Sequence, residues 1–150
     1  MYSQEIPQVS SGAYVNSTDL RILIAEDEIT HSIAISRRLG KVYPNARIEV
    51  VTSIRDYQNS IAAVMPTIAL LDLNLADGCS LDMLKASASP PSFPVIMLSS
   101  SASRQVAADA IQAGAVDFII KTPEIFLSIA DIVEKTVREW EQYPGKNGSR

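Results

Sequence analysis

The chain has 150 residues, of which 47% are hydrophobic and 20% are charged, a composition typical of one globular domain with its own core. Its formal net charge of −4 argues against a general nucleic-acid binder, which needs a basic surface. The single cysteine, Cys79, excludes an internal disulfide framework, and the longest apolar run, residues 61–71, contains Pro66 and is too short to span a bilayer. No cleavable apolar leader opens the chain, so we expect a cytoplasmic protein without membrane insertion.

Polar segments without a sustained period stand at both ends of the chain. We expect residues 1–19 to be a flexible N-terminal tail, residues 20–143 to form one domain, and residues 144–150 to be a flexible C-terminal end.

Strand and helix patterns alternate through the domain. Short apolar runs predict strands over residues 21–25, 46–52, 67–72, 95–98 and 116–120. Helical spacing and capping signals predict helices over residues 30–39, 54–65, 81–88, 104–113 and 123–143. This alternation favours a single α/β domain, with one open and mostly parallel sheet covered by helices on both faces.

Capping residues define several of the predicted helix ends. Gly40 and Gly114 are expected to end the first and fourth helices, because glycine accepts a left-handed backbone. Ser53, Ser80 and Thr122 are expected to cap the start of the second, third and fifth helices.

Chemically distinctive residues stand where four of the predicted strands end. They are Glu26 and Asp27 after the first strand, Asp72 at the end of the third, Ser99 after the fourth and Lys121 after the fifth. Because the carboxyl ends of parallel strands share one edge of a sheet, these side chains should surround a single crevice. The sequence therefore predicts three carboxylates, one hydroxyl and one ammonium in one site.

This set of residues has a specific chemistry. Carboxylates held together repel one another and tend to bind a cation, and oxygen ligands without a Cys or His cluster favour Mg²⁺. A carboxylate can also accept a phosphoryl group. We therefore predict phosphoryl chemistry with Asp72 as the nucleophile; Glu26 and Asp27 would hold the metal, and Lys121 and Ser99 would contact the phosphoryl oxygens.

Four ordered motifs, ILIAEDE, LLDLNLADG, PVIMLSSS and AGAVDFIIK, resemble those of the receiver domain of two-component response regulators. The resemblance covers about residues 20–143. It implies a flavodoxin-like (βα)5 fold whose five-stranded parallel sheet has the order 2-1-3-4-5. The polar residues Arg47 and Glu49 of the second strand fit a place at the sheet edge.

The resemblance also implies a function as a signalling domain rather than a classical enzyme. Asp72 would accept a phosphoryl group from a histidine kinase or a histidine phosphotransfer protein, with Mg²⁺ as cofactor. The backbone carbonyl of Asn74 would join the metal ligands, Ser99 and Phe118 would be the switch residues, and the fourth helix, fifth strand and fifth helix would rearrange. A downstream output domain or a partner protein would take up the signal, and a homodimer is also possible.

The chain departs from the family pattern at three positions. Ala76 stands where the family often has proline, and Ser80 stands where related loops often carry a second glycine, so the shape of this loop is open. Thr122 separates Lys121 from Pro123, so the usual cis bond after the lysine is not expected.

Two other functions are compatible with parts of the pattern. A receiver-like interaction module that works without phosphorylation would be favoured by a missing acid or lysine, and none is missing. An aspartyl-nucleophile phosphatase of the haloacid-dehalogenase type would need an acid two residues after Asp72, where the chain has Asn74. His31, in step with Ile35 and Leu39, is interpreted as a core or rim residue of the first helix.

Overall fold

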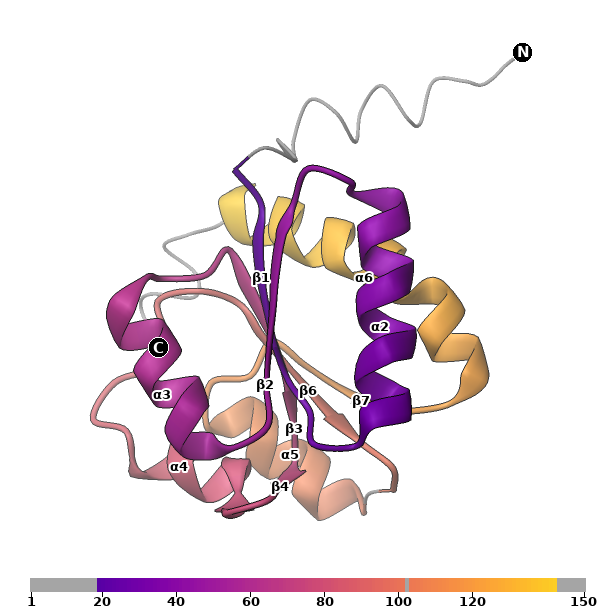
Figure 1. Ribbon diagram of the computed structural model, residues 1–150. Helices are drawn as coiled ribbons and strands as arrows, with labels where there is room; N and C mark the ends of the chain where they lie inside the picture. The colour runs from indigo at the N-terminus through magenta and orange to yellow at the C-terminus, as the bar shows by residue number, and fades with distance from the viewer. Residues whose placement is uncertain (1–18, 102, 143–150) are drawn as a thin grey trace.

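The computed structural model describes residues 19–101 and 103–142 (Figure 1). The predicted tails, residues 1–19 and 144–150, lie outside this part of the chain except for Asp19. Five strands form one parallel sheet: β1 (Arg21–Ala25), β2 (Arg47–Val51), β3 (Ile68–Asp72), β6 (Val95–Ser99) and β7 (Asp117–Ile120). Their order is β2-β1-β3-β6-β7, which is the predicted order 2-1-3-4-5. The predicted flavodoxin-like fold is confirmed.

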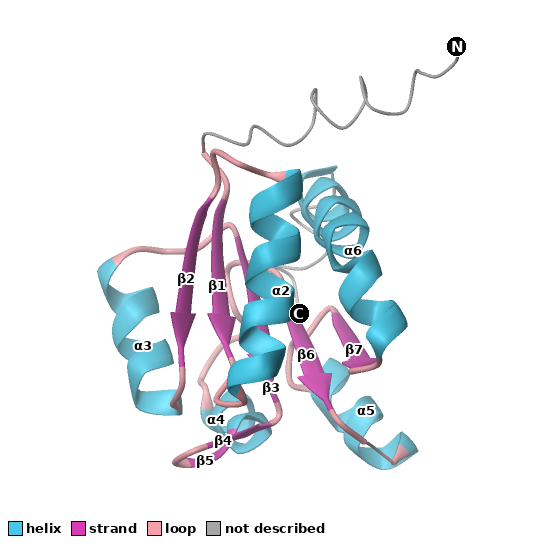
Figure 2. Cartoon of the chain, turned by 45° about the vertical axis from the view of Figure 1, so that its right-hand side comes forward, coloured by secondary structure: helices cyan, strands magenta, loops and turns pink. Residues whose placement is uncertain are grey.

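Two layers of helices cover the sheet (Figure 2). The helices are α2 (Ile29–Val42), α3 (Ile54–Ala63), α4 (Ser80–Ala86), α5 (Arg104–Gln112) and α6 (Pro123–Gln142). On one face, Ile22 and Ile24 of β1 pack in a core with α2 and α6. On the other face, Leu23 and Ala25 pack in a second core with α3, α4 and α5. This alternation along one strand places both faces in apolar surroundings, as a central strand of a parallel sheet requires.

The strand β2 lies at an edge of the sheet and is the most polar of the five. Of its five residues only Val51 is buried, whereas every residue of β3 and β6 is buried. The expectation that the second strand lies at the sheet edge is confirmed.

The two predicted glycine stops have different outcomes. Gly114 follows the end of α5 with φ of 115°, a backbone conformation that favours glycine. A Cβ at this position would also stand only 2.8 Å from Cδ of Pro91, so both the backbone and the available space require glycine. Gly40 does not end α2, which continues to Val42. Gly40 does not take the positive φ that ends a helix at Gly114, and a Cβ at this position would meet nothing closer than Cδ1 of Ile48 at 3.9 Å, so glycine is not required here.

Side-chain caps begin three of the helices. Ser53 accepts a hydrogen bond from the backbone N–H of Asp56, and Thr122 accepts one from that of Ile125 at 3.1 Å, as predicted. Ser103 caps α5 in the same way. No cis peptide bond is found in the described part of the chain, which agrees with the expectation for the bond after Lys121.

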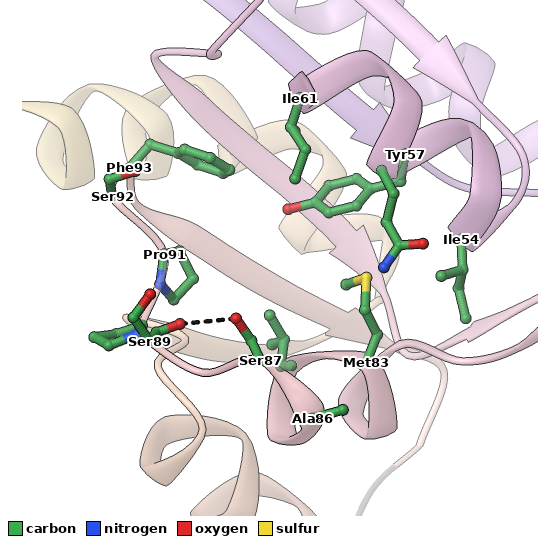
Figure 3. A pocket seen from close by; sticks show the side chains of 13 residues that line it. Ile54, Tyr57, Ile61, Met83, Ala86, Ser87, Ser89, Pro91, Ser92 and Phe93 are labelled. Carbon is green, nitrogen blue, oxygen red and sulfur yellow. Dashed lines mark hydrogen bonds between the residues drawn. The ribbon is translucent and has the colours of Figure 1, made fainter. Parts of the chain in front are cut away.

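A pocket of about 440 Å³ lies between α3, α4 and the loop of residues 87–93 (Figure 3). Tyr57 of α3 is 2% exposed, and its hydroxyl points into the pocket. No hydrogen bond joins this hydroxyl to another residue of the described ranges. Burial raises the pKa of Tyr57 above its ordinary value, so the phenol stays protonated. The ring therefore contributes through packing, and the hydroxyl adds little to stability.

We expect Tyr57→Phe to change the free energy of unfolding by less than about 1 kcal/mol, because it removes a hydroxyl without a protein partner. Tyr57→Ala should lower it by about 3–5 kcal/mol, because it leaves a cavity in the core. Urea denaturation of the two variants measures both values. A loss of more than about 2 kcal/mol in the Phe variant would contradict this interpretation of the hydroxyl.

Candidate functional site

Three carboxylates lie together at the carboxyl edge of the sheet. Asp72 is the last residue of β3, and Glu26 and Asp27 follow the neighbouring strand β1. Each offers one oxygen, and these oxygens all lie within 4.8 Å of one another. Glu26 is 1% exposed and Asp72 is 6% exposed, whereas Asp27 lies open to solvent. The structure thus brings together the three acids that the sequence predicted, two of them buried.

Lys121 brings a positive charge to the acidic cluster. It follows β7, and its backbone N–H donates to the carbonyl of Ser99 at the end of β6. Its Nζ donates to Glu26 Oε1 at 2.7 Å and to Asp72 Oδ2 at 3.2 Å, and its side chain is 3% exposed. One buried ammonium therefore joins the carboxylates at the ends of two other strands.

Ser99 lies at the predicted edge, but its hydroxyl contacts its own loop. Its Oγ donates to the backbone carbonyl of Ser101 and accepts from the N–H of the same residue at 3.3 Å. No hydrogen bond between this hydroxyl and Asp72 or Lys121 is found in the described ranges. The residue is in place, with its hydroxyl held by Ser101.

The surroundings of Asp72 raise the pKa of its carboxyl group. Burial, a hydrogen bond with Glu26 and the charge of Glu26 raise the pKa of Asp72 to about 7, and Lys121 offsets only part of this. The single ammonium of Lys121 therefore does not offset the combined effect of burial and of Glu26 on Asp72. Three closely spaced carboxylate oxygens with only one ammonium beside them are a donor set that suits a hard divalent cation.

The sequence interpretation of His31 as only a core or rim residue missed its place in the site. His31 Nδ1 lies 3.1 Å from Lys121 Nζ, and its ring packs on Phe126 with the ring centres 5.4 Å apart. The position within the first helical turn after β1 was the available signal, because that turn must lie beside the carboxyl edge of the sheet.

The loop after Asp72 folds as a short hairpin of β4 (Asn74–Leu75) and β5 (Gly78–Cys79). At its tip the carboxylate of Asp77 accepts from the N–H groups of Ile54 and Arg55, at 2.7 and 3.1 Å. These bonds hold the pKa of Asp77 below its ordinary value. Asp77 thereby caps the start of α3, a contact that the sequence interpretation did not include.

The prediction that Ser80 caps the third helix is wrong. Ser80 is the first residue of α4, and the preceding Cys79 holds the N-cap position without a side-chain bond. The Ser80 hydroxyl is fully buried and donates to the backbone carbonyl of Asp72 at 2.6 Å. A second bond from the Ser80 N–H to the carbonyl of Leu73 completes the link. Serine at this position therefore holds the loop to the end of β3.

Asn74 and Phe118 are the two remaining predicted site residues, and in the described ranges neither has a hydrogen bond to the acidic cluster. Asn74 opens β4 with an exposed side chain, two residues beyond Asp72. Phe118 lies on β7 beside Met97 and packs, partly buried, against the core of the α3, α4 and α5 face. Their proposed roles as metal ligand and switch residue stay predictions.

The motifs and this geometry agree with a comparison against known families. The family model described as "Response regulator receiver domain" matches residues 22–133. The chain belongs to this family.

Individual relatives and structures agree with the assignment. The methanogenesis regulatory protein FilR1 of Methanothrix harundinacea is 27% identical over 125 residues, which cover 81% of this chain and 28% of that protein. Regulatory protein LuxO of Vibrio vulnificus is 35% identical over 98 residues, or 65% of this chain and 22% of that protein. The CheY-like receiver domain of Methanospirillum hungatei matches the fold with a TM-score of 0.70 at 22% identity, over 82% of this chain and 97% of that chain.

The chain spans between 22% and 35% of the length of the curated relatives it matches. Among the described residues, no helix is both long enough and apolar enough to cross a membrane. The similarity to these relatives is therefore confined to a part of each of them.

The raised pKa of Asp72 predicts how stability depends on pH. Between about pH 4 and pH 7 the folded state holds a proton on Asp72 that the unfolded state releases, so the free energy of unfolding falls as pH rises through this window. Asp72→Asn should remove that loss and be more stable above pH 7, by about 1–2 kcal/mol after allowance for solvent screening.

Urea denaturation with a chelator present, at several pH values, measures this difference. Asp131→Asn on the exposed face of α6 is the matched control and should behave as the unchanged protein. Equal stability of the Asp72 variant and the unchanged protein at every pH would contradict the prediction.

Proposed function

We propose that the chain is the phosphoacceptor module of a cytoplasmic two-component phosphorelay. Asp72 would accept a phosphoryl group from a histidine kinase or a histidine phosphotransfer protein. The observation that carries this proposal is the buried Asp72 carboxylate with Glu26, Asp27 and Lys121 grouped around it at the carboxyl edge of the sheet.

Mg²⁺ is the cofactor that the acidic cluster supports best. Glu26, Asp27 and Asp72 would hold it, and the backbone carbonyl of Asn74 would add a fourth oxygen. When bound, the ion would offset the negative charge that gathers as a phosphoryl group approaches three carboxylates.

Asp72 and Lys121 would have different roles in the transfer. An oxygen of Asp72 would form the new bond to phosphorus as the phosphorus–nitrogen bond of the donor breaks, and the electron pair of that bond would return to the imidazole nitrogen. The Lys121 ammonium, 3.2 Å from Asp72 Oδ2, would contact a phosphoryl oxygen and stabilise its charge.

Ser99 would transmit the phosphorylation of Asp72 to the surface of the domain. Its hydroxyl would leave Ser101 to bond a phosphoryl oxygen, which alters the loop between β6 and α5. Phe118 lies on the neighbouring strand β7 and would follow as the second switch residue. The signal would then pass through α5, β7 and α6 to an output domain, a partner protein or a second copy of the chain.

The alternative functions are less well supported. A multi-turnover phosphatase needs an acid where the chain has the neutral amide Asn74, which cannot exchange a proton as an acid does. An interaction module independent of phosphorylation has no need of a buried lysine bonded to two carboxylates.

Incubation with acetyl phosphate and Mg²⁺ should add one phosphoryl group, because Asp72 is the carboxylate at the centre of the cluster. Intact-mass spectrometry detects the addition. Asp72→Asn should remain unlabelled, whereas the control Asp131→Asn should be labelled like the unchanged protein. Labelling of the Asp72 variant would show that another residue is the acceptor.

Mg²⁺ should raise the melting temperature, because it binds the folded acidic cluster and not the unfolded chain. At a concentration about 100 times its dissociation constant, the ion adds roughly 2.7 kcal/mol to the free energy of unfolding. Asp27→Asn should lose most of this gain, and the exposure of Asp27 makes it the acid whose replacement disturbs the core least. Equal gains in the variant and the unchanged protein, measured by thermal denaturation, would argue against this metal site.

A further inference from the structure

The Lys121 ammonium has a third partner besides the two buried carboxylates. His31 Nδ1 lies 3.1 Å from Nζ, beside Glu26 Oε1 at 2.7 Å and Asp72 Oδ2 at 3.2 Å. An ammonium carries three N–H donors, so each of these three atoms can take one of them. The histidine therefore completes the hydrogen bonding of a side chain that is only 3% exposed.

The contact defines which ring nitrogen of His31 carries the proton. An ammonium can only donate, so Nδ1 must accept and the proton of the neutral ring must lie on Nε2. The distance from Nδ1 to Glu26 Oε1 is 3.8 Å, longer than a hydrogen bond. His31 thus bonds to Lys121 and not to the carboxylate beside it.

His31 also contacts α6. Its ring packs on Phe126 in the first turns of α6, with centres 5.4 Å apart. Arg38 Nε, farther along α2, and the hydroxyl of Tyr43, just after its end, donate to backbone carbonyls of α6, both at 3.1 Å. These contacts join the helix that carries His31 to the helix that begins two residues after Lys121.

His31 differs from the other two partners in an important way. Glu26 and Asp72 belong to the acidic cluster, so a cation and a phosphoryl group would both compete with Lys121 for their oxygens. His31 is outside that cluster, and its bond to Nζ can remain while the other two are exchanged.

We propose that His31 is a positioning residue for Lys121 in phosphoryl transfer. It holds the ammonium beside Asp72 when the bond from Nζ to the carboxylate gives way to one with a phosphoryl oxygen. This inference rests on the proposed function, because it assigns a role within the same reaction.

Two replacements separate the hydrogen bond from simple packing. His31→Asn keeps an acceptor oxygen close to the place of Nδ1, whereas His31→Leu keeps apolar bulk against Phe126 and removes the acceptor. Arg37→Ala, on the exposed side of the same helix, is the matched control. With acetyl phosphate and saturating Mg²⁺, His31→Leu should lower the rate constant of labelling roughly five- to tenfold, and His31→Asn should restore most of it.

Mg²⁺ affinity separates this role from a merely structural one, because a replacement that disturbed the whole site would also weaken Mg²⁺ binding. The Leu variant should bind Mg²⁺ as tightly as the unchanged protein, because the three acids are intact. Equal labelling rates in the Leu variant and the Arg37 control would overturn the proposal, as would equal losses in the Leu and Asn variants. If the unchanged protein takes up no phosphoryl group, the proposed function fails and this inference fails with it.

The ring tautomer tests the contact without any phosphoryl group. The chain has one histidine, so its ring ¹⁵N resonances need no assignment. In metal-free protein at about pH 8, where a histidine ring is ordinarily neutral, the proton should be found on Nε2. A proton on Nδ1 would overturn the proposal even if phosphorylation itself is observed.

Discussion

The buried ion-pair network of Lys121 is the interaction on which the rest of the site depends. Glu26 follows β1 and Asp72 ends the neighbouring strand β3. Both are almost fully buried, so their charges would be costly without a compensating cation. The lysine supplies one positive charge to both, at 2.7 and 3.2 Å. This one charge serves two buried carboxylates and a nearby third, and burial together with Glu26 raises the pKa of Asp72 to about 7 in spite of it. The cluster is therefore receptive to a second cation.

Strand ends were predictable because they follow from local pattern and from a general rule. Apolar runs that stop at Glu26, Asp72, Ser99 and Lys121 are visible in the sequence, and a parallel sheet places such ends on one edge. The strand order and the polar edge strand β2 agreed as well. The predicted roles of the site residues, beyond their positions, are matters for experiment.

Tertiary contacts decided the features that the sequence could not predict. Gly40 and Gly114 stand at similar points of helical patterns, yet only Gly114 takes a positive φ and ends its helix, and Pro91 leaves no room there for a Cβ. Spacing grouped His31 with Ile35 and Leu39, which are buried in the core. Its ring lies instead one turn nearer the sheet edge, where it meets Lys121, a residue 90 positions away in the chain.

The loop after Asp72 departs from the family pattern at Ser80, yet this residue helps to anchor the loop. Ser80 stands where a glycine is common, and its hydroxyl bonds the carbonyl of Asp72. Asp77 fixes the other end of the same loop to α3 through two backbone N–H groups. The backbone around Asp72 is therefore held from both sides. By contrast, the side chains of Ser99 and Lys121 are bonded to groups that a phosphoryl oxygen could replace. A response to phosphorylation would then start at β6 and β7, while the acceptor and its loop keep their shape.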